Sequence, residues 1–145
     1  MAGFEVIGDI KDGSLRKLPV STYTGAIGDL IELAIGSTTW SACTAASQGW
    51  SRKAIVMETA TAASSVLAYE LNGSETVKAE SNASGAAAAN GDRMILTDTN
   101  TVNNTGTDNT SEEACFIQDG YAGAATDKRI VGRVIVGNGV DPAAT

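Results

Sequence analysis

The chain has 145 residues, a net charge of −7 at neutral pH and a hydrophobic fraction of 43%, much of which is alanine. A chain of this length predicts one domain that is large enough to bury a core. An acidic chain repels nucleic-acid phosphates, and its apolar runs are all shorter than the roughly 18 residues of a membrane span, so we expect neither partner. The absence of histidine removes the commonest general base, the Ser-His-Asp and Cys-His arrangements, and most zinc sites.

The first twenty residues predict an extended N-terminal arm. Glycines interrupt them, their apolar pattern is weakly periodic, and Pro19 disfavours a helix immediately before it. We expect this arm, residues 1–20, to form a strand only against a partner. Its candidate binding side chains are three apolar and two basic ones: Phe4, Val6, Ile7, Arg16 and Lys17. Its start lacks the apolar segment of a secretory signal, so we expect a soluble protein made inside the cell.

The rest of the chain, residues 21–145, predicts a single β domain. Ile31, Leu33 and Ile35 alternate with smaller or polar residues, which is the period of a strand with one buried face. Further apolar runs between turn residues predict strands over residues 52–59, 66–71, 75–80, 93–97, 114–118 and 129–136. About seven short strands spaced in this way are typical of an all-β sandwich or small barrel.

The turn residues between these runs predict their connections. Asn72-Gly73 is a strong signal for a two-residue hairpin, which would pair residues 66–71 with 75–80. Residues 81–90 and 99–111 are rich in small and polar residues, and we expect both to be loops. The apolar residues of the strand runs predict the core: Ile31, Leu33, Ile35, Ile55, Val56, Leu67, Leu71, Ile95, Ile117, Ile130, Val134 and Val136.

Trp40 and Trp50 enclose a small, polar segment that we expect to be a loop or a single helical turn. Tryptophan buries a large area at low entropic cost, so these two residues are candidates for anchoring the core or an oligomer interface. Stacking on a sugar is the alternative for the same pair.

No motif in the chain predicts catalysis, a cofactor or a metal ion. Asp98-Thr99-Asn100 begins like a calcium loop, but Val102 and Asn103 stand where that loop needs an oxygen ligand and a glycine. The adjacent acids Glu112-Glu113 are expected to be solvated. Two cysteines, Cys43 and Cys115, do not make a disulfide framework, and we expect two buried thiols. We therefore expect that the protein is not an enzyme.

The layout of the chain resembles a known family. An extended arm is followed by Gly28-Asp29-Leu30 at the start of the first core strand, a long Thr/Asn-rich loop over residues 99–111, and a final strand with Val131-Gly132-Arg133-Val134. This arrangement covers most of the chain and resembles the head decoration, or capsid cement, proteins of tailed bacteriophages. The resemblance rests on arrangement and composition.

The resemblance implies an all-β fold, a small β-sandwich or β-tulip-like barrel with an extended N-terminal arm. It also implies a homotrimer on the outer capsid surface of a virion, made in the host cytoplasm, that binds the major capsid protein and has no catalytic site. A trimer that touches several capsid subunits gains avidity without a strong single contact, and an extended arm adds a strand to a neighbouring sheet. The alternative is a glycan-binding or tail-associated β domain that uses the Trp40–Trp50 segment. A glycosidase with two catalytic carboxylates is a third and more distant alternative.

Overall fold

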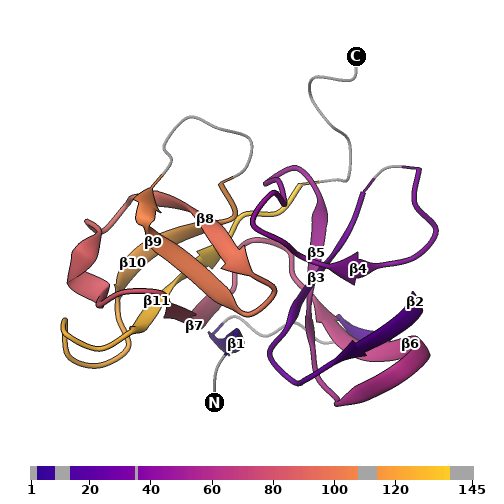
Figure 1. Ribbon diagram of the computed structural model, residues 1–145. Coiled ribbons are helices and arrows are strands. Elements are labelled where there is room, and N and C mark those ends of the chain that lie inside the picture. The colour runs from indigo at the N-terminus through magenta and orange to yellow at the C-terminus, as the bar shows by residue number, and fades with distance from the viewer. Residues whose placement is uncertain (1–2, 9–13, 35, 108–113, 138–145) are drawn as a thin grey trace.

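The computed structural model describes residues 3–8, 14–34, 36–107 and 114–137. These residues form eleven strands and a single short 3-10 helix, η1 (Gly85–Ala87), with no α-helix among them, which confirms the predicted all-β class. The strands belong to two curled sheets that lie side by side (Figure 1). The rolled sheet surrounds an apolar cluster of its own, and a second cluster joins the two sheets.

The first sheet closes on itself. Its order is β1-β7-β11-β10-β8-β9, and a parallel pairing of β7 with β9 joins the ends, so that β7, β11, β10, β8 and β9 form a closed barrel. Strand β1 pairs with β7 alongside this ring. The strands are β1 (Glu5–Gly8), β7 (Thr76–Ser81), β8 (Arg93–Asp98), β9 (Thr101–Thr107), β10 (Phe116–Tyr121) and β11 (Arg129–Val134).

The second sheet, which we call the rolled sheet, has the order β2-β6-β5-β3-β4. It curls towards closure, but its two edges meet at one parallel bridge between Val20 and Trp40, where the Trp40 N–H donates to the Pro19 carbonyl at 2.8 Å. The strands are β2 (Leu15–Gly25), β3 (Leu30–Leu33), β4 (Ser41–Ala42), β5 (Arg52–Val56) and β6 (Ala60–Glu70).

Two apolar clusters fill the molecule. One lies inside the rolled sheet and includes Leu18, Ile31 and Val66. The other includes side chains of the barrel strands, such as Phe116, together with residues of the rolled sheet, such as Ile55. Full burial of a side chain of this size stabilises the fold by about 1.5–3 kcal/mol, so this shared cluster holds the two sheets together.

Hydrogen bonds also join the two sheets. The Leu30 N–H donates to the Thr99 carbonyl at 2.7 Å, and the Thr99 hydroxyl returns a bond to the Leu30 carbonyl at 2.8 Å. After β11 the chain crosses to the rolled sheet, where the Gly137 N–H donates to the Ser51 carbonyl at 3.1 Å. A Cβ at Gly137 would lie 2.2 Å from the Trp50 carbonyl oxygen, so this crossing requires glycine.

The predicted hairpin around Asn72-Gly73 is wrong. Strand β6 pairs with β2 and β5 in the rolled sheet, whereas β7 pairs with β1, β11 and β9 in the barrel. The turn is therefore a crossover between the sheets. Its geometry comes from the side chain of Glu75, which accepts the N–H groups of Asn72 and Gly73 at 3.0 and 3.1 Å.

The predicted arm is extended, but the described part of it pairs within the molecule. Strand β1 binds β7, and β2 pairs with β6 from Leu15↔Tyr69 onwards. The expected boundary between residues 20 and 21 falls inside β2, so it does not separate an arm from a domain. Residues 15–20 add a strand to the chain's own sheet, a pairing that was expected only against a partner.

The predicted core is partly correct. Six of its residues are buried: Ile31, Ile55, Val56, Leu71, Ile130 and Val134. Five are only half-buried: Leu33, Leu67, Ile95, Ile117 and Val136. Ile35 lies outside the described residues. In β8, Met94 and Leu96 face the core in place of Ile95, and in β10 Phe116 and Gln118 face it in place of Ile117.

Strand β9 occupies much of the stretch predicted as a loop. Val102 and Asn104 are buried, whereas Asn103 between them is half-buried and Thr105 after them is exposed. The alternation is that of a strand, although only one of these side chains is apolar. Asn104 is tolerated inside because its amide donates to the Ser84 carbonyl at 2.8 Å and accepts the Ala83 N–H at 3.1 Å.

Candidate functional site

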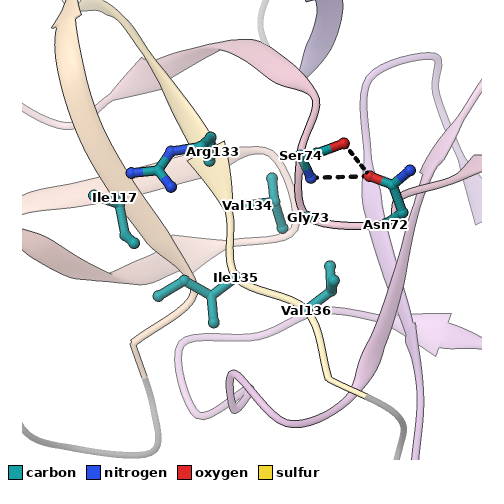
Figure 2. A pocket seen from close by; sticks show the side chains of 8 residues that line it. All are labelled: Asn72, Gly73, Ser74, Ile117, Arg133, Val134, Ile135 and Val136. Atoms are coloured by element: carbon teal, nitrogen blue, oxygen red, sulfur yellow. Dashed lines mark hydrogen bonds between the residues drawn. The ribbon is translucent and has the colours of Figure 1, made fainter. Parts of the chain in front are cut away.

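A pocket of about 630 Å³ opens beside the β6–β7 crossover, on the outer face of β10 and β11 (Figure 2). Ile117, Ile135 and Val136 are half-buried there and give it an apolar floor. Its lining residues are Asn72, Gly73, Ser74, Ile117, Arg133, Val134, Ile135 and Val136. An apolar surface with a few polar groups at its edge is typical of a binding site.

The polar edge of the pocket comes from Arg133 and from the crossover. The Arg133 Nε and Nη2 atoms donate to the two carboxylate oxygens of Asp119 at 3.1 and 3.3 Å, on the solvent-exposed face of the barrel. On the opposite side, the Asn72 Oδ1 atom accepts bonds from the Ser74 N–H and hydroxyl. The pocket therefore presents one guanidinium and one amide to a bound molecule.

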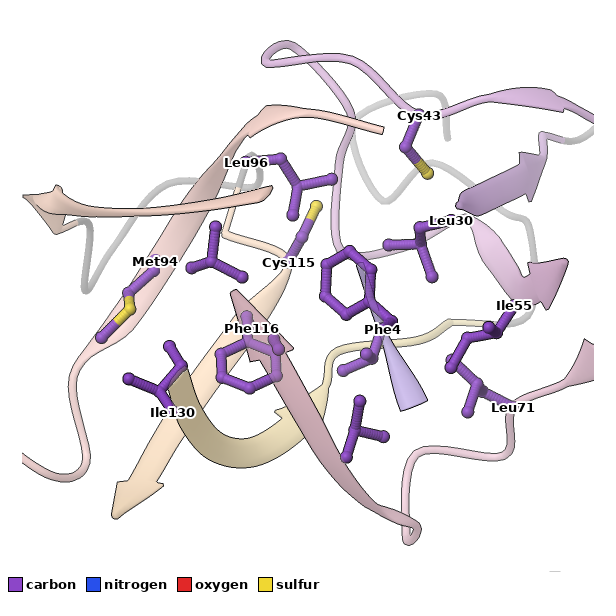
Figure 3. Close-up of a cluster of buried hydrophobic side chains, with 14 of the residues drawn as sticks. Phe4, Leu30, Cys43, Ile55, Leu71, Met94, Leu96, Cys115, Phe116 and Ile130 are labelled. Carbon is purple, nitrogen blue, oxygen red and sulfur yellow. The ribbon is translucent and has the colours of Figure 1, made fainter. Parts of the chain in front are cut away.

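Phe4, the first predicted anchor, is part of the core. It is 2% exposed, its N–H donates to the Gly28 carbonyl at 2.8 Å, and its ring centroid lies 6.3 Å from that of Phe116. Figure 3 shows its ring among side chains from both sheets. Phe4 is therefore occupied by the chain's own core and is not available to bind a partner in this conformation.

The other two predicted anchors differ in accessibility. Val6 packs partly buried against the shared core, opposite Val77 of β7. Ile7 is exposed and remains available for contact. The predicted capsid-binding role of the first residues therefore rests on Ile7 rather than on Phe4.

Arg16 and Lys17 point to opposite faces of β2, because neighbouring residues of a strand alternate. Arg16 lies on the same face as Leu18 and binds the Glu70 carboxylate at 2.5 Å. Lys17 lies on the outer face and binds Glu58 at 2.5 Å, which lowers the pKa of that carboxyl group. The two cations therefore do not form one binding patch.

An exposed apolar strip that sequence reasoning missed lies beside Lys17. Leu15, on the same face of β2, is 51% exposed, and Lys17 is opposite the half-buried Leu67 of β6. Met57, whose N–H donates to the Leu67 carbonyl at 2.9 Å, is 43% exposed. We call Leu15, Leu67 and Met57 the β2–β6 strip. The sequence signal for this strip was the spacing of Leu15 and Leu18, because residues three apart in a strand lie on opposite faces, so that only one of the two could enter the core.

Trp40 is a core residue of the rolled sheet, with 3% of its surface exposed. The Arg52 guanidinium lies 5.5 Å from the ring centroid and binds Glu70 through Nε and Nη2 at 2.8 and 2.9 Å. Burial raises the pKa of Glu70, but hydrogen bonds from Arg52 and Arg16 outweigh this effect and bring it below its usual range. Of the three predicted roles for Trp40, its burial fits anchoring the core and leaves almost no ring surface for an oligomer interface, and sugar stacking would require Arg52 to move.

Trp50 is half-buried, and its indole N–H donates to the side-chain oxygen of Gln48. The segment between the two tryptophans consists of β4 and successive turns, as expected for a loop. Trp40 and Trp50 thus do not present a shared aromatic surface, because Trp40 is inside the rolled sheet. Trp50 stays a candidate for an oligomer interface.

A buried polar network supports this segment, and sequence reasoning missed it. Lys53 is fully buried, and its ammonium group donates to the Gln48 carbonyl at 2.6 Å, to the Ser51 hydroxyl at 3.0 Å and to the Ser51 carbonyl at 3.3 Å. The Ser51 hydroxyl in turn donates to Glu32 at 3.0 Å. The three N–H donors of a lysine are all used, so this group acts as a structural cation and not as a general base.

Both cysteines are free and buried, as expected. Burial raises the pKa of the Cys43 thiol well above its usual range, and the Cys115 thiol donates to the Ser47 carbonyl at 3.2 Å. A thiol that stays protonated is a poor nucleophile and a poor metal ligand. In the described parts of the chain, no group of three or more cysteine, aspartate or glutamate side chains is placed to hold a metal ion.

No family model matches the chain, and neither the curated proteins nor the solved structures give a match. Among the residues that the structure describes, no helix is long and apolar enough to cross a membrane.

Proposed function

We propose that this chain is a structural virion protein that decorates and stabilises the outer surface of a phage capsid by binding major capsid proteins. The layout of the sequence supports this function, as does a fold whose described polar clusters are used to hold strands and loops in place. The single observation that carries the proposal is the β2–β6 strip. It exposes two large apolar side chains, Leu15 and Met57, beside the cation Lys17 on an otherwise acidic protein.

Such a strip is suited to protein contact. Exposed apolar surface with polar groups at its edge marks interaction sites, and the Lys17–Glu58 ion pair supplies a polar edge to this strip. A single strip of this size binds weakly. A homotrimer would present three copies to neighbouring capsid subunits and would gain avidity from their simultaneous attachment.

The first test is co-sedimentation with capsids assembled from the major capsid protein encoded in the same genome. We expect the wild-type chain to sediment with capsids and the double variant Leu15→Ser, Met57→Ser to stay in the supernatant. Tyr121→Ser is the matched control, because Tyr121 is an exposed apolar residue on the barrel. Equal binding by the double variant and the wild type would rule out the strip as the attachment surface.

The oligomeric state needs its own measurement. Light scattering of the free protein and counting of density on decorated capsids should both give trimers. Monomers in both states would contradict the trimer. The glycan-binding alternative gains no support from Trp40, because its ring is covered by Arg52, and a glycan array would test it directly.

A further inference from the structure

The crossover between the two sheets holds one side-chain amide in a polarised state. The Asn72 Oδ1 atom accepts the Ser74 N–H at 2.9 Å and the Ser74 hydroxyl at 2.6 Å (Figure 2). Two donors on one carbonyl oxygen withdraw electrons from its carbon, and they are placed to stabilise negative charge that develops on the oxygen during attack. Asn72 is exposed, so water reaches this carbon.

The adjacent backbone nitrogen is held against a base. The Gly73 N–H donates to the Glu75 Oε1 atom at 3.1 Å, and the Glu75 side chain is 1% exposed and also accepts the Asn72 N–H. A carboxylate at hydrogen-bond distance from a proton is positioned to remove it as a general base. Residue 73 is glycine with a φ of +92°, so no side chain shields its nitrogen.

From this arrangement we propose that the folded protein deamidates its own Asn72. The Gly73 nitrogen attacks the Asn72 Cγ atom with its lone pair, and Glu75 takes the proton that the nitrogen loses. The same proton goes to the leaving amide group, which departs as ammonia and leaves a succinimide ring. Water then adds to either ring carbonyl and opens it to aspartate or isoaspartate, so the net change is the exchange of ammonia for water.

Asn90-Gly91 provides a comparison within the chain. The Gly91 N–H donates to the Gln118 carbonyl at 2.6 Å, which is not a base, and the Asn90 Oδ1 atom accepts the Gln118 amide at 3.3 Å. The second Asn-Gly pair therefore has the same two residue types without the carboxylate. The rate of deamidation at Asn90 in the folded protein therefore shows how fast an Asn-Gly pair reacts when the glycine N–H is bound to a backbone carbonyl instead of a carboxylate.

The reaction would change the pocket. Asn72 and Arg133 both line it, from the crossover and from β11. A carboxylate in place of the Asn72 amide would add a negative charge opposite the guanidinium, and an isoaspartate would also lengthen the backbone of the crossover by one carbon. A ligand or partner that binds in this pocket would therefore distinguish fresh protein from aged protein.

The decisive measurement compares the folded protein with the urea-unfolded protein at the same pH and temperature. Peptide mapping by mass spectrometry gives the rate of deamidation at Asn72 and Asn90 in each sample, and hydrolysis in ¹⁸O-labelled water marks succinimide opening. We expect Asn72 to react at least about tenfold faster folded than unfolded, and Asn90 to react more slowly when folded. A slower reaction at Asn72 in the folded state would overturn the proposal, because the hydrogen bonds would then protect it.

Two variants separate the base from the oxyanion donor. Glu75→Gln removes the base and should slow deamidation at Asn72 about tenfold or more while leaving Asn90 unchanged. Ser74→Ala removes one donor to the Asn72 oxygen at an exposed position and should also slow it, whereas Ser74→Thr keeps the hydroxyl and should retain the rate. Faster deamidation of Asn72 in Glu75→Gln or in Ser74→Ala would contradict the roles of the base and of the oxyanion donor. If Glu75→Gln fails to fold, the Ser74 pair still decides.

Discussion

The barrel and the rolled sheet are both curled, yet they are closed to different extents. In the barrel, backbone pairing joins the ends, with Glu80 and Ser81 of β7 opposite Thr101 and Val102 of β9. In the rolled sheet, a single bridge at Val20 and Trp40 joins the edges. The barrel therefore pairs its end strands, whereas the edges of the rolled sheet share one bridge and the Trp40 side chain completes its interior.

Their open ends are covered in correspondingly different ways. At the barrel, the amide of Gln118 donates to the Gly85 carbonyl at 3.0 Å, which ties down η1, and the amide of Asn104 binds the segment just before it. At the rolled sheet, Trp40 is covered by Arg52, which Glu70 holds. The contacts at the barrel end are made by neutral amides, whereas those at the rolled sheet depend on the Arg52–Glu70 ion pair. Acid should therefore destabilise the rolled sheet more than the barrel.

The largest expected effect tests whether the two regions depend on each other. Phe4→Ala removes a buried ring from the core that both sheets share, and we expect it to lower the free energy of unfolding by about 3–5 kcal/mol. Chemical denaturation followed by tryptophan fluorescence and by circular dichroism measures the loss. Val66→Ala, in the cluster that lies inside the rolled sheet alone, is the control for a loss confined to one sheet. A loss below about 0.5 kcal/mol for Phe4→Ala would mean that the first residues are not part of the core.

The next effect tests the face assigned to β8 in the barrel. Leu96 is buried and Ile95 is half-buried on the opposite face. We expect Leu96→Ala to cost about 2–5 kcal/mol and Ile95→Ala distinctly less, because only the first leaves a cavity. Thermal unfolding of the two variants makes the comparison. Equal losses would show that the strand is not oriented as described.

A smaller effect is expected at the buried cation behind the rolled sheet. Lys53→Met keeps the length of the side chain but leaves the Gln48 and Ser51 acceptors without their donor. Hydrogen bonds to charged groups contribute about 1.5–3 kcal/mol, and we expect a loss of that order. Limited proteolysis should also cut the segment around residue 48 sooner in the variant. Unchanged stability and cleavage would contradict the structural role of Lys53.

The smallest effect concerns acid and the mouth of the rolled sheet. The pKa of Glu70 lies below its usual range in the folded protein, so its contribution is present above about pH 4.3 and is lost as the pH falls through the folded value. We expect the melting temperature of the wild type to fall more between about pH 6 and pH 3 than that of Glu70→Gln. Gln118→Met, at the barrel end, should keep the full acid dependence of the wild type. Equal acid dependence in the wild type and Glu70→Gln would contradict this assignment.

The positions of most strands could be predicted from the sequence, but which residues of a strand face the core could not always be predicted. The runs Met94-Ile95-Leu96 and Cys115-Phe116-Ile117 are apolar at every position, so a period of two fits either face. The choice depended on volume and partners in the finished core. Gln118 shows this most clearly, because a polar residue is buried where the carbonyl of Gly85 accepts its amide.

The pairing of the strands depended even less on local sequence. Asn72-Gly73 has the composition of a hairpin turn, yet Glu75 binds its N–H groups and the chain continues into the other sheet. Val102 and Asn104 lie in a Thr/Asn-rich stretch without a continuous apolar pattern, and β9 exists because β8 and β7 pair with it. In each case, a distant partner supplied the deciding interaction.

The sequence by itself determined the all-β class, most of the strand positions, the absence of histidine chemistry and the burial of both thiols. These properties follow from composition and from short-range periodicity, which any local stretch of the chain carries. Only the tertiary structure decided that Phe4 enters the core, that Arg16 and Lys17 separate, and that Lys53 is buried with its donors satisfied. Burial and hydrogen-bond satisfaction are properties of residues that meet in space, and no local pattern of residue types specifies which ones meet.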